Sequence, residues 1–400
     1  MTTKVVAPKL RFKSLGSKYP EWGTSTLGTV ADFLDGRRKP IKESDRAKIK
    51  GKYPYYGASG IIDFVNDFIF DEDIILLGED GENIVSRNLP LAFKVTGKCW
   101  VNNHAHVIKP KGNINLNFLV QYLDKISYLE YNTGTAQPKL NQEVCKKIPV
   151  PVPDLEEQTK IANFLTAVDA KISQLTKKHE LLSSYKKGVM QKIFNQELRF
   201  KDDDRREFPE WELTTIGEIS SKITAGGTPS TLKKEYWGGS IRWMNSGELN
   251  LKVVFEVENR ITQAGLENSS TKLIPKNCVL IGLAGQGKTR GTVAMNLVEL
   301  CTNQSIAAIL PNPTIFNTHY LYQNLEARYD ELRSLSAGDG GRGGLNLQII
   351  KSMEISLPCL KEQTKIANFL TAIDDRITNV KSQLDAAKEY KQGLLQQMFV

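Results

Sequence analysis

The chain has 400 residues, of which 40% are hydrophobic, 24% charged and 8% aromatic. This length exceeds what one hydrophobic core usually holds, and the composition is that of a folded protein, so a single small domain and a disordered or fibrous chain are excluded. No apolar stretch approaches the roughly 18 residues that a membrane-spanning helix needs. Lys and Arg number 53 against 45 Asp and Glu, a net charge of +8 that favours a polyanionic partner.

The cysteines and the start of the chain bear on its location. The five cysteines are odd in number and form no CxxC pair, and the first residues contain no apolar segment of the kind found in secretion signals. We therefore expect reduced thiols and a cytoplasmic protein.

Residues 1–152 are expected to form a first globular block. Ile74–Leu77 and Leu91–Val95 are short apolar runs bounded by Gly, Asn and Pro turns, and they predict strands. Leu116–Tyr128 has the pattern of a helix. The block is therefore predicted to be a mixed α/β or α+β domain.

A strongly basic run lies within this block. From Arg37 to Lys52 there are eight Lys or Arg residues against two acids, and Tyr53, Tyr55 and Tyr56 follow. Cationic side chains next to aromatic rings are typical of a nucleic-acid-binding surface, because cations neutralise phosphates and rings stack on bases. A solvated surface loop is the alternative interpretation.

Cys99, His104 and His106 lie close enough in the sequence to suggest a metal site. No fourth ligand at a suitable spacing completes a tetrahedral set, so a metal is not expected. Motifs for a methyl donor, a methylase tetrapeptide and a pair of acids for catalytic magnesium are also missing from the sequence. We predict no catalytic residue.

Residues 153–195 are expected to form a long helix. Apolar residues recur at alternating spacings of four and three, the heptad pattern of a coiled coil. The seam begins with Ile161, Leu165, Val168 and Ile172. Asp154 with Glu157 predicts a capping box at the start. A helix from Ile161 to Ile193 would be about 50 Å long and marginal alone, so we expect it to pack on a second helix.

Residues 196–211 are rich in both charges and are predicted to be an exposed linker. Residues 212–357 are expected to form a second block of the same kind, with strands at Val279–Leu283 and Ile306–Leu310 and a helix at Thr318–Leu332. Lys222, Lys233, Lys234, Arg242 and the glycine-rich segment 338–344 would supply its basic surface.

Residues 282–289 match the phosphate-loop pattern GxxxxGK[ST]. A phosphate loop needs a helix that begins at the Lys-Thr pair, whereas the continuation from Arg290 to Met295 is rich in glycine and β-branched residues and predicts a returning strand. We therefore expect a hairpin tip that presents Gln286, Lys288, Thr289 and Arg290, either to DNA or only to solvent.

Residues 358–400 repeat the first helix. EQTKIANFLTA occurs at 157–167 and again, without a difference, at 362–372. LRFK at 10–13 recurs at 198–201, and PEW at 20–22 recurs at 209–211. The matching seam positions are Ile366, Leu370, Ile373 and Ile377. The chain is therefore two copies of one unit, in which the helices are constant and the globular blocks differ.

Two divergent blocks that each precede the same EQxxIAxFL helix resemble the DNA-specificity (S) subunits of type I restriction-modification systems, over essentially the whole chain. In the first block the similar motifs are YPYYGASGIID at 53–63 and GEDG at 78–81. In the second block they are GGTPST at 226–231, YWGG at 236–239 and IRW at 241–243. NQSIAA at 303–308 fits the asparagine-glutamine strand start of the family, and its first-block counterpart is expected at 103–106, with His104 in place of glutamine.

The resemblance implies an α+β (mixed α/β) fold related by a pseudo-twofold repeat. Two target-recognition domains would alternate with two long helices packed as an antiparallel coiled coil. The implied boundaries are 1–152 for the first domain, 153–195 for the first helix, 196–211 for the linker, 212–357 for the second domain and 358–400 for the second helix.

The resemblance also implies a non-catalytic, sequence-specific DNA-binding subunit. Each domain would read one half of a split double-stranded target, while the helices set the spacing and dock two methyltransferase (M) subunits. S-adenosylmethionine would belong to the M subunits, and ATP and Mg²⁺ to two restriction (R) subunits in systems that have them. We expect no cofactor in this chain and no membrane association.

The side chains expected to contact DNA come from both blocks. In the first block they are Arg37, Arg38, Lys39, Lys42, Lys52, Tyr55, Asn103 and His104. In the second block they are Thr228, Ser230, Arg242, Asn245, Gln286, Lys288, Thr289, Arg290, Gln304 and Arg342. A self-contained DNA methyltransferase or nuclease and a coiled-coil adaptor that does not bind DNA remain as alternatives, which binding to DNA and to a modification subunit would distinguish.

Overall fold

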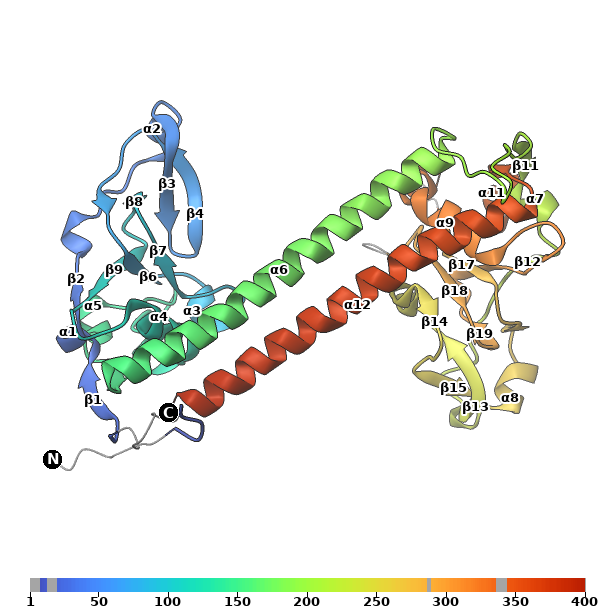
Figure 1. Cartoon of the computed structure of the whole chain (residues 1–400). Coiled ribbons are helices and arrows are strands. Elements are labelled where there is room, and N and C mark those ends of the chain that lie inside the picture. The colour runs from blue at the N-terminus through green and yellow to red at the C-terminus, as the bar shows by residue number, and fades with distance from the viewer. Residues whose placement is uncertain (1–7, 13–19, 286–288, 336–343, 400) are drawn as a thin grey trace. The chain divides into compact units, whose positions relative to one another are not determined.

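A computed structural model describes residues 8–12, 20–285, 289–335 and 344–399 of the chain (Figure 1). Contacts divide the chain into two compact units. Unit 1 is Met1–Lys177 together with Lys381–Val400, and unit 2 is Lys178–Val380. Each unit therefore combines one globular block with part of each long helix. Within the described ranges, no helix is both long enough and apolar enough to cross a membrane.

Unit 1 contains three small sheets, with strand orders β2-β9-β6-β7, β4-β3-β8-β5 and β1-β10. The strands are β1 (Gly23–Thr26), β2 (Ala31–Phe33), β3 (Lys50–Gly57), β4 (Gly60–Val65), β5 (Phe70–Asp71), β6 (Ile74–Gly78), β7 (Ala92–Val95), β8 (Lys98–Val101), β9 (Ala105–Pro110) and β10 (Pro149–Val152). The helices are α1 (Leu27–Val30), η1 (Asp35–Arg37), α2 (Glu43–Arg46), α3 (Asn83–Ser86), α4 (Leu116–Lys125), η2 (Leu129–Tyr131) and α5 (Gln142–Cys145). The strands and the helix predicted for this block are confirmed at β6, β7 and α4.

Unit 2 repeats this plan with one more strand, in the orders β12-β20-β17-β18-β14, β15-β13-β19-β16 and β11-β21. The strands are β11 (Glu212–Thr215), β12 (Ile223–Ala225), β13 (Trp237–Met244), β14 (Val253–Val254), β15 (Asn259–Ile261), β16 (Leu273–Ile274), β17 (Val279–Gly282), β18 (Val293–Asn296), β19 (Leu300–Thr302), β20 (Ile306–Ile309) and β21 (Glu354–Leu357). The helices are α7 (Ile216–Ile219), η3 (Lys234–Tyr236), η4 (Ser246–Leu251), α8 (Gln263–Glu267), α9 (Thr318–Ala327), α10 (Tyr329–Ser334) and α11 (Leu347–Ser352). The single helix expected at Thr318–Leu332 is two helices, α9 and α10.

The central strand of each first sheet is buried on both faces. In β6, Ile75 and Leu77 join the core beneath α4, whereas Ile74 and Leu76 face a second core that the β3–β8 sheet covers. Because successive side chains of a strand point to opposite faces, a strand covered on both sides must be apolar throughout. The uninterrupted run that predicted this strand reflects that double burial.

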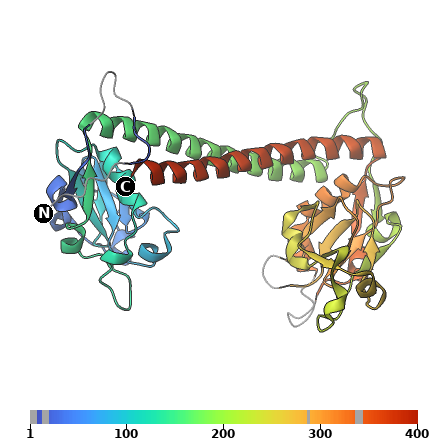
Figure 2. The same ribbon diagram turned by 90° about the horizontal axis from the view of Figure 1, so that it is seen from below.

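The two long helices are α6 (Leu155–Phe194) and α12 (Leu360–Met398). In unit 1 the start of α6, with Ile161 and Leu165, packs in one core with Leu394 and Met398 at the end of α12 (Figure 2). In unit 2 the start of α12 packs with the end of α6 in the same way. The helices therefore run antiparallel within each unit, which confirms the predicted pairing.

The seam residues predicted on both helices lie inside these cores or at their edges. Ile161, Leu165, Ile366, Leu370 and Ile373 are buried, and Val168, Ile172 and Ile377 are half-buried. The first helix begins at Leu155, directly after the cap predicted at Asp154.

The start of α6 corrects one expectation. Asp154 accepts a hydrogen bond from the backbone N–H of Glu156, as a cap should. The carboxylate of Glu157, however, does not complete a capping box, because it is fully buried and accepts hydrogen bonds from Arg11 (2.6 Å) and from the indole N–H of Trp22 (3.0 Å). It therefore joins the N-terminal segment to the helix.

The same joint occurs in unit 2. Glu362 is also fully buried and accepts from Arg199 (3.0 Å) and from Trp211 (3.0 Å). The repeated LRFK, PEW and EQ motifs thus meet at one carboxylate in each unit, which explains why they recur together. Residues 196–211, expected to be an exposed linker, are tied to unit 2 by Arg199 and by the buried ring of Phe208.

Candidate nucleic-acid interface

The basic run of unit 1 covers η1, α2 and the first half of β3. Lys39, Lys42, Lys50 and Lys52 are exposed. Among the described residues, no ion pair joins Lys39, Lys42 or Lys50 to an acid. Arg37 is different, because its guanidinium pairs with Glu72 at 2.6 Å and lies over the ring of Phe70. The lysines therefore form the free cationic part of this surface.

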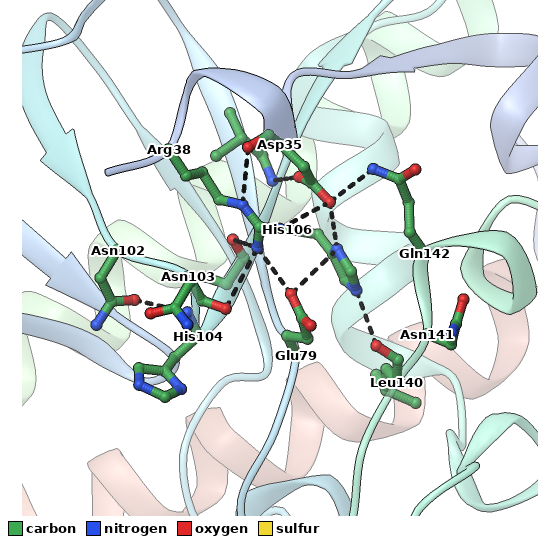
Figure 3. A network of polar contacts seen from close by, with 12 residues as sticks. Asp35, Arg38, Glu79, Asn102, Asn103, His104, His106, Leu140, Asn141 and Gln142 are labelled. Atoms are coloured by element: carbon green, nitrogen blue, oxygen red, sulfur yellow. Dashed lines mark hydrogen bonds and ion pairs between the residues drawn. The ribbon is translucent and has the colours of Figure 1, made fainter. Parts of the chain in front are cut away.

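Arg38 belongs to a polar network beneath that surface (Figure 3). Its Nη1 donates to the carboxylate of Glu79 at 2.7 Å and to the carbonyl of Ala105 at 2.8 Å. Asp35 lies 3.4 Å from its Nη2, and the Arg38 side chain is only 14% exposed. Arg38 therefore holds η1 against the end of β6 and the start of β9, and in this conformation its guanidinium does not face solvent.

His106 of β9 is the buried centre of the same network. Its Nδ1 lies 2.7 Å from the Asp35 carboxylate and its Nε2 lies 3.0 Å from the carbonyl of Leu140. Gln142 and the backbone N–H of Val107 also donate to Asp35, so Asp35 acts as an acceptor throughout. Two acceptors facing the two ring nitrogens require an imidazolium, with a proton on each nitrogen.

The electrostatics agree with that protonation state. Burial lowers the pKa of His106, but the contacts with Asp35 and with Cys145 outweigh burial and raise the pKa to about 10. Burial has the opposite effect on Asp35 and raises its pKa. The contacts with His106 and Val107 more than offset this rise and leave the pKa of Asp35 below its usual value.

Asp35, Glu79 and His106 also bring ligand-type atoms within 4.8 Å of one another. The arrangement does not suit a metal ion, because Arg38 already neutralises both carboxylates and the Nε2 of His106 donates to a carbonyl. Cys99, the third residue of the metal set weighed from the sequence, lies in a different core. The network is therefore ionic and organises the surface above it.

The turn between β8 and β9 carries Asn103 and His104 on the surface next to this network. Asn102 forms the turn: its N–H donates to the carbonyl of Tyr56, and its side chain accepts from the N–H of His104 at 2.8 Å. His104 is exposed and its Nδ1 lies 2.8 Å from Asp80. Asn103 and His104 are thus presented on a rigid turn.

Tyr55, which was expected to contact DNA, is buried in the structure. Its side chain is 1% exposed, its hydroxyl accepts from the N–H of Ile41, and Arg46 lies over its ring. Alternation along β3 directs it inward. It therefore supports the basic run from below and has no face available for stacking on a base.

Unit 2 contains the same turn between β19 and β20. The N–H of Asn303 donates to the carbonyl of Met244, and its side chain accepts from the N–H of Ser305 at 3.1 Å. Asn303 is therefore the counterpart of Asn102, and Gln304 that of Asn103. The alignment expected from the sequence, which placed Asn103 opposite Asn303, is wrong by one residue.

The predicted residues of unit 2 divide into surface and structural groups. Thr228 donates to Gln304 at 2.7 Å, and both are exposed, as is Ser230. Arg242 pairs with Glu256 at 3.2 Å on the surface. Asn245 caps η4 in a capping box with Glu248, so its side chain is occupied by the fold.

The segment that matches a phosphate loop returns as strand β18, antiparallel to β17, which confirms the predicted strand in place of a helix. Thr289 and Arg290 are half-buried at the start of this return. Gln286, Lys288 and Arg342 lie outside the described residues.

Sequence reasoning missed the acids that position the surface. Asp35 and Glu79 meet only in the fold, because 44 positions separate them in the chain. The signal available for the buried glutamates was their unchanged recurrence: Glu157 and Glu362 open the eleven-residue motif that is identical in both units.

The sequence matches the family described as the type I restriction modification DNA specificity domain over residues 19–183 and again over 209–388. A Haemophilus influenzae protein assigned as a type I restriction enzyme specificity subunit is 28% identical over 95% of this chain and 94% of its own length. The EcoR124I/EcoR124II specificity subunit of Escherichia coli is 30% identical over 62% of this chain and 60% of its own.

Solved structures show the same fold. The crystal structure of a type I restriction-modification S subunit from M. genitalium aligns over 99% of both chains with a TM-score of 0.67 and 15% identity. A chain from a study of assembly of the type I restriction-modification system aligns over 95% of this chain and 98% of its own, with a TM-score of 0.50 and 16% identity.

The family match and the fold therefore define a two-unit protein of the DNA-specificity class. The chain belongs to the family of type I restriction-modification DNA specificity subunits. This agrees with the resemblance inferred from its motifs.

Proposed function

We propose that each unit reads one half of a bipartite DNA target, and that the turns at Asn102 and Asn303 lie at the two reading surfaces. The observation that carries the proposal is the pairing of these turns. The same backbone hydrogen bonds hold both, yet one exposes Asn103 and His104 and the other exposes Gln304 beside Thr228. A constant support for variable polar side chains is what two readers of different sequences require.

The charges around the turn of unit 1 fit a duplex. Lys39, Lys42 and Lys52 would contact phosphates and fix the position of the unit, whereas amide side chains such as that of Gln304 pair with base edges. Phosphate contacts set the salt dependence of binding and base contacts set the sequence preference, so the two groups can be separated by experiment.

The test is an exchange of residues 23–152 for the corresponding block of another family member, followed by mapping of the methylated sequence in cells that also contain the modification subunits. We expect one half of the target to change and the other half to stay. A change in both halves, or in neither, would refute independent reading by the two units.

The helices are proposed to set the spacing between the half-sites. One continuous 40-residue helix contributes its first part to the core of unit 1 and its last part to that of unit 2. Deletion of one heptad from each helix, 175–181 and 380–386, keeps the seam in phase and shortens each helix by about 10 Å, or about three base pairs.

The shortened protein should select half-sites that are unchanged but lie closer together. Selection of the original gap at full affinity would leave the helices only the role of docking partner subunits. We further propose that two M subunits dock on this chain, that S-adenosylmethionine belongs to them, and that ATP and Mg²⁺ belong to R subunits.

A further inference from the structure

The edge strand β4 carries three large apolar side chains that the fold does not cover. Ile61 is 49% exposed, Ile62 is 55% exposed and Phe64 is 48% exposed. They lie within four consecutive positions of a strand that, among the described strands, pairs with β3 alone (Figure 1). Contiguous exposed apolar groups on a soluble protein generally mark a binding surface.

A β-bulge produces this exposure. Ile61 lies opposite Tyr56 and Asp63 lies opposite Tyr55, so Ile62 is an extra residue without a cross-strand partner. One extra residue shifts the alternation of faces, and neighbouring isoleucines are both exposed as a result. Asp63 pairs with Arg46, which lies over the ring of Tyr55, so the strand is anchored from its other side.

The surroundings of this apolar ridge, defined as Ile61, Ile62 and Phe64, are cationic. On β3, Lys50 lies opposite Val65 and Lys52 lies in the register shift between Lys50 and Tyr53, and both lysines are exposed. Four of the eight basic residues between Arg37 and Lys52 pair with acids, and within the described residues no ion pair engages the other four, the exposed Lys39, Lys42, Lys50 and Lys52. An apolar ridge within so positive a surface complements duplex DNA better than it complements an ordinary protein surface.

Unit 2 has no such ridge at the corresponding place. Strand β15 pairs with β13 as β4 pairs with β3, but it consists of Asn259, Arg260 and Ile261, and its one isoleucine is fully buried. The surface chemistry of this strand therefore differs between the units while its position is retained, which is the behaviour of a specificity element and not of a shared docking surface.

We propose that the apolar ridge of β4 contacts thymine 5-methyl groups in the major groove of the half-site read by unit 1. This inference rests on the proposed function. The major groove admits a two-stranded β-ribbon, and the thymine methyl is the apolar group that a base edge displays there. The lysines of β3 would hold the phosphates beside it.

The test is a double-mutant cycle that removes the thymine methyl groups from the DNA and the apolar side chains from the protein, separately and together. The target of the full-length chain is selected from random duplexes, and the half read by unit 1 is identified by the block exchange described above. Thymines in that half are then replaced by uracil, which lacks only the methyl group. Affinities for both duplexes are measured for the wild-type chain and for the triple variant Ile61→Ala, Ile62→Ala, Phe64→Ala, and for each single variant in case the triple variant fails to fold.

We expect each buried methyl to contribute about fourfold to the affinity of the wild-type chain. The triple variant should bind thymine and uracil duplexes equally, and the single variants should show a smaller thymine preference than the wild-type chain. Leu129→Ala is the matched control, because Leu129 is 60% exposed on η2, outside the hairpin, and its loss should leave the thymine effect intact.

Three results would overturn the inference. The first is a half-site for unit 1 without thymine, and the second is an undiminished uracil effect in the variants. The third is a variant that binds DNA normally but no longer binds the modification subunit, which would make the ridge a protein-docking surface. A wild-type chain without any sequence preference would refute the proposed function as well, so the two failures are distinguishable.

Discussion

The two units hold their equivalent turns with chemically different side chains, which are charged in unit 1 and apolar in unit 2. Strand pairing makes His106 the counterpart of Ala307. The register of β2 with β9, extended two residues beyond Phe33, places Asp35 opposite His106 as Ala225 lies opposite Ala307. Glu79 corresponds to Leu283, because their N–H groups make equivalent hydrogen bonds. The N–H of Glu79 donates to the carbonyl of His104, two residues after Asn102, and that of Leu283 donates to the carbonyl of Ser305, two residues after Asn303. An ionic network in one unit is therefore an apolar contact in the other.

This difference shows which part of the support is fixed. The backbone hydrogen bonds recur in both units, whereas the side chains between them are either charged and mutually neutralised or small and apolar. A buried ionic group and well-packed apolar residues of similar volume are often close in stability, but a half-removed ionic group is costly. The comparison can be tested by removing the network in part and then as a whole.

The largest effect is expected for His106→Ala. It leaves the buried carboxylate of Asp35 without its nearest cation, which should lower the free energy of unfolding by about 3–5 kcal/mol. The variant Asp35→Ala, Arg38→Thr, Glu79→Leu, His106→Ala introduces the residues of unit 2, with Thr228 as the counterpart of Arg38 because it follows Ala225 by three residues as Arg38 follows Asp35. The loss of unfolding free energy in this fourfold variant should be smaller, about 1–3 kcal/mol, because the N–H of Val107 loses its acceptor Asp35 but no buried charge is left unpaired.

Chemical denaturation of the three proteins provides the measurement. A fourfold variant less stable than His106→Ala alone would show that the two supports are not interchangeable.

The same histidine makes the two units respond differently to pH. Because the folded-state pKa of His106, about 10, lies above its value of about 6.5 in the unfolded chain, its stabilisation is complete below pH 6.5 and is lost as the pH rises toward 10. The destabilisation by His106→Ala should therefore shrink between pH 6.5 and 10. Thermal unfolding across this range checks it, and Ala307→Gly serves as a control whose effect should not vary with pH in this way.

A third comparison concerns equivalent lysines on the two helices. Lys186 pairs with Asp374 (2.7 Å) and with Glu326 (2.8 Å), whereas Lys391 pairs with Asp169 (2.7 Å). Burial lowers the pKa of Lys186, but the two acids outweigh burial and raise it. Lys186→Met leaves Asp374 without its cation and Glu326 with Lys252 (3.3 Å) as its remaining cation, so it should cost about 2–3 kcal/mol, and Lys391→Met about 1 kcal/mol. Equal costs in denaturation would show that the second acid contributes nothing.

The sequence predicted features that depend on neighbouring or periodic residues, and it missed features that depend on contacts between distant parts of the chain. The repeat and the heptads predicted two paired helices, because both signals are periodic along the chain, and apolar runs located β6, β7, β17 and β20. Tyr55 and Arg38 were assigned to the surface by composition. Their burial depends on strand alternation and on Glu79, which lies 41 residues from Arg38.

The turn residues show the same limit. Asn102 and Asn103 are adjacent and identical in type, so only the hydrogen bond from Asn102 to Tyr56 distinguishes the structural asparagine from the exposed one. Similarly, the exposed ridge of β4 depends on a bulge, a register shift between two strands that no local pattern in Ile61 or Ile62 displays.

The smallest expected effect is the one most specific to partner docking. Tyr185 and Tyr390 are equivalent, exposed residues of the two helices, and each is followed three positions later by a glycine, Gly188 or Gly393. A Cβ added at either glycine would meet nothing within 4 Å in this chain. A glycine within a helix lowers stability by about 1 kcal/mol relative to alanine, so the fold itself gives no reason to keep one.

Gly188→Ala and Gly393→Ala should therefore each stabilise the isolated chain by about 0.5–1 kcal/mol. If the Tyr-x-x-Gly face of each helix docks an M subunit, the added methyl groups should weaken binding of that subunit while stabilising the chain. Changes of opposite sign in thermal unfolding and in subunit affinity would locate the docking face, and equal effects at both glycines would show that the two units use it in the same way. Stabilisation with unchanged subunit affinity would move the docking surface to another face of the helices.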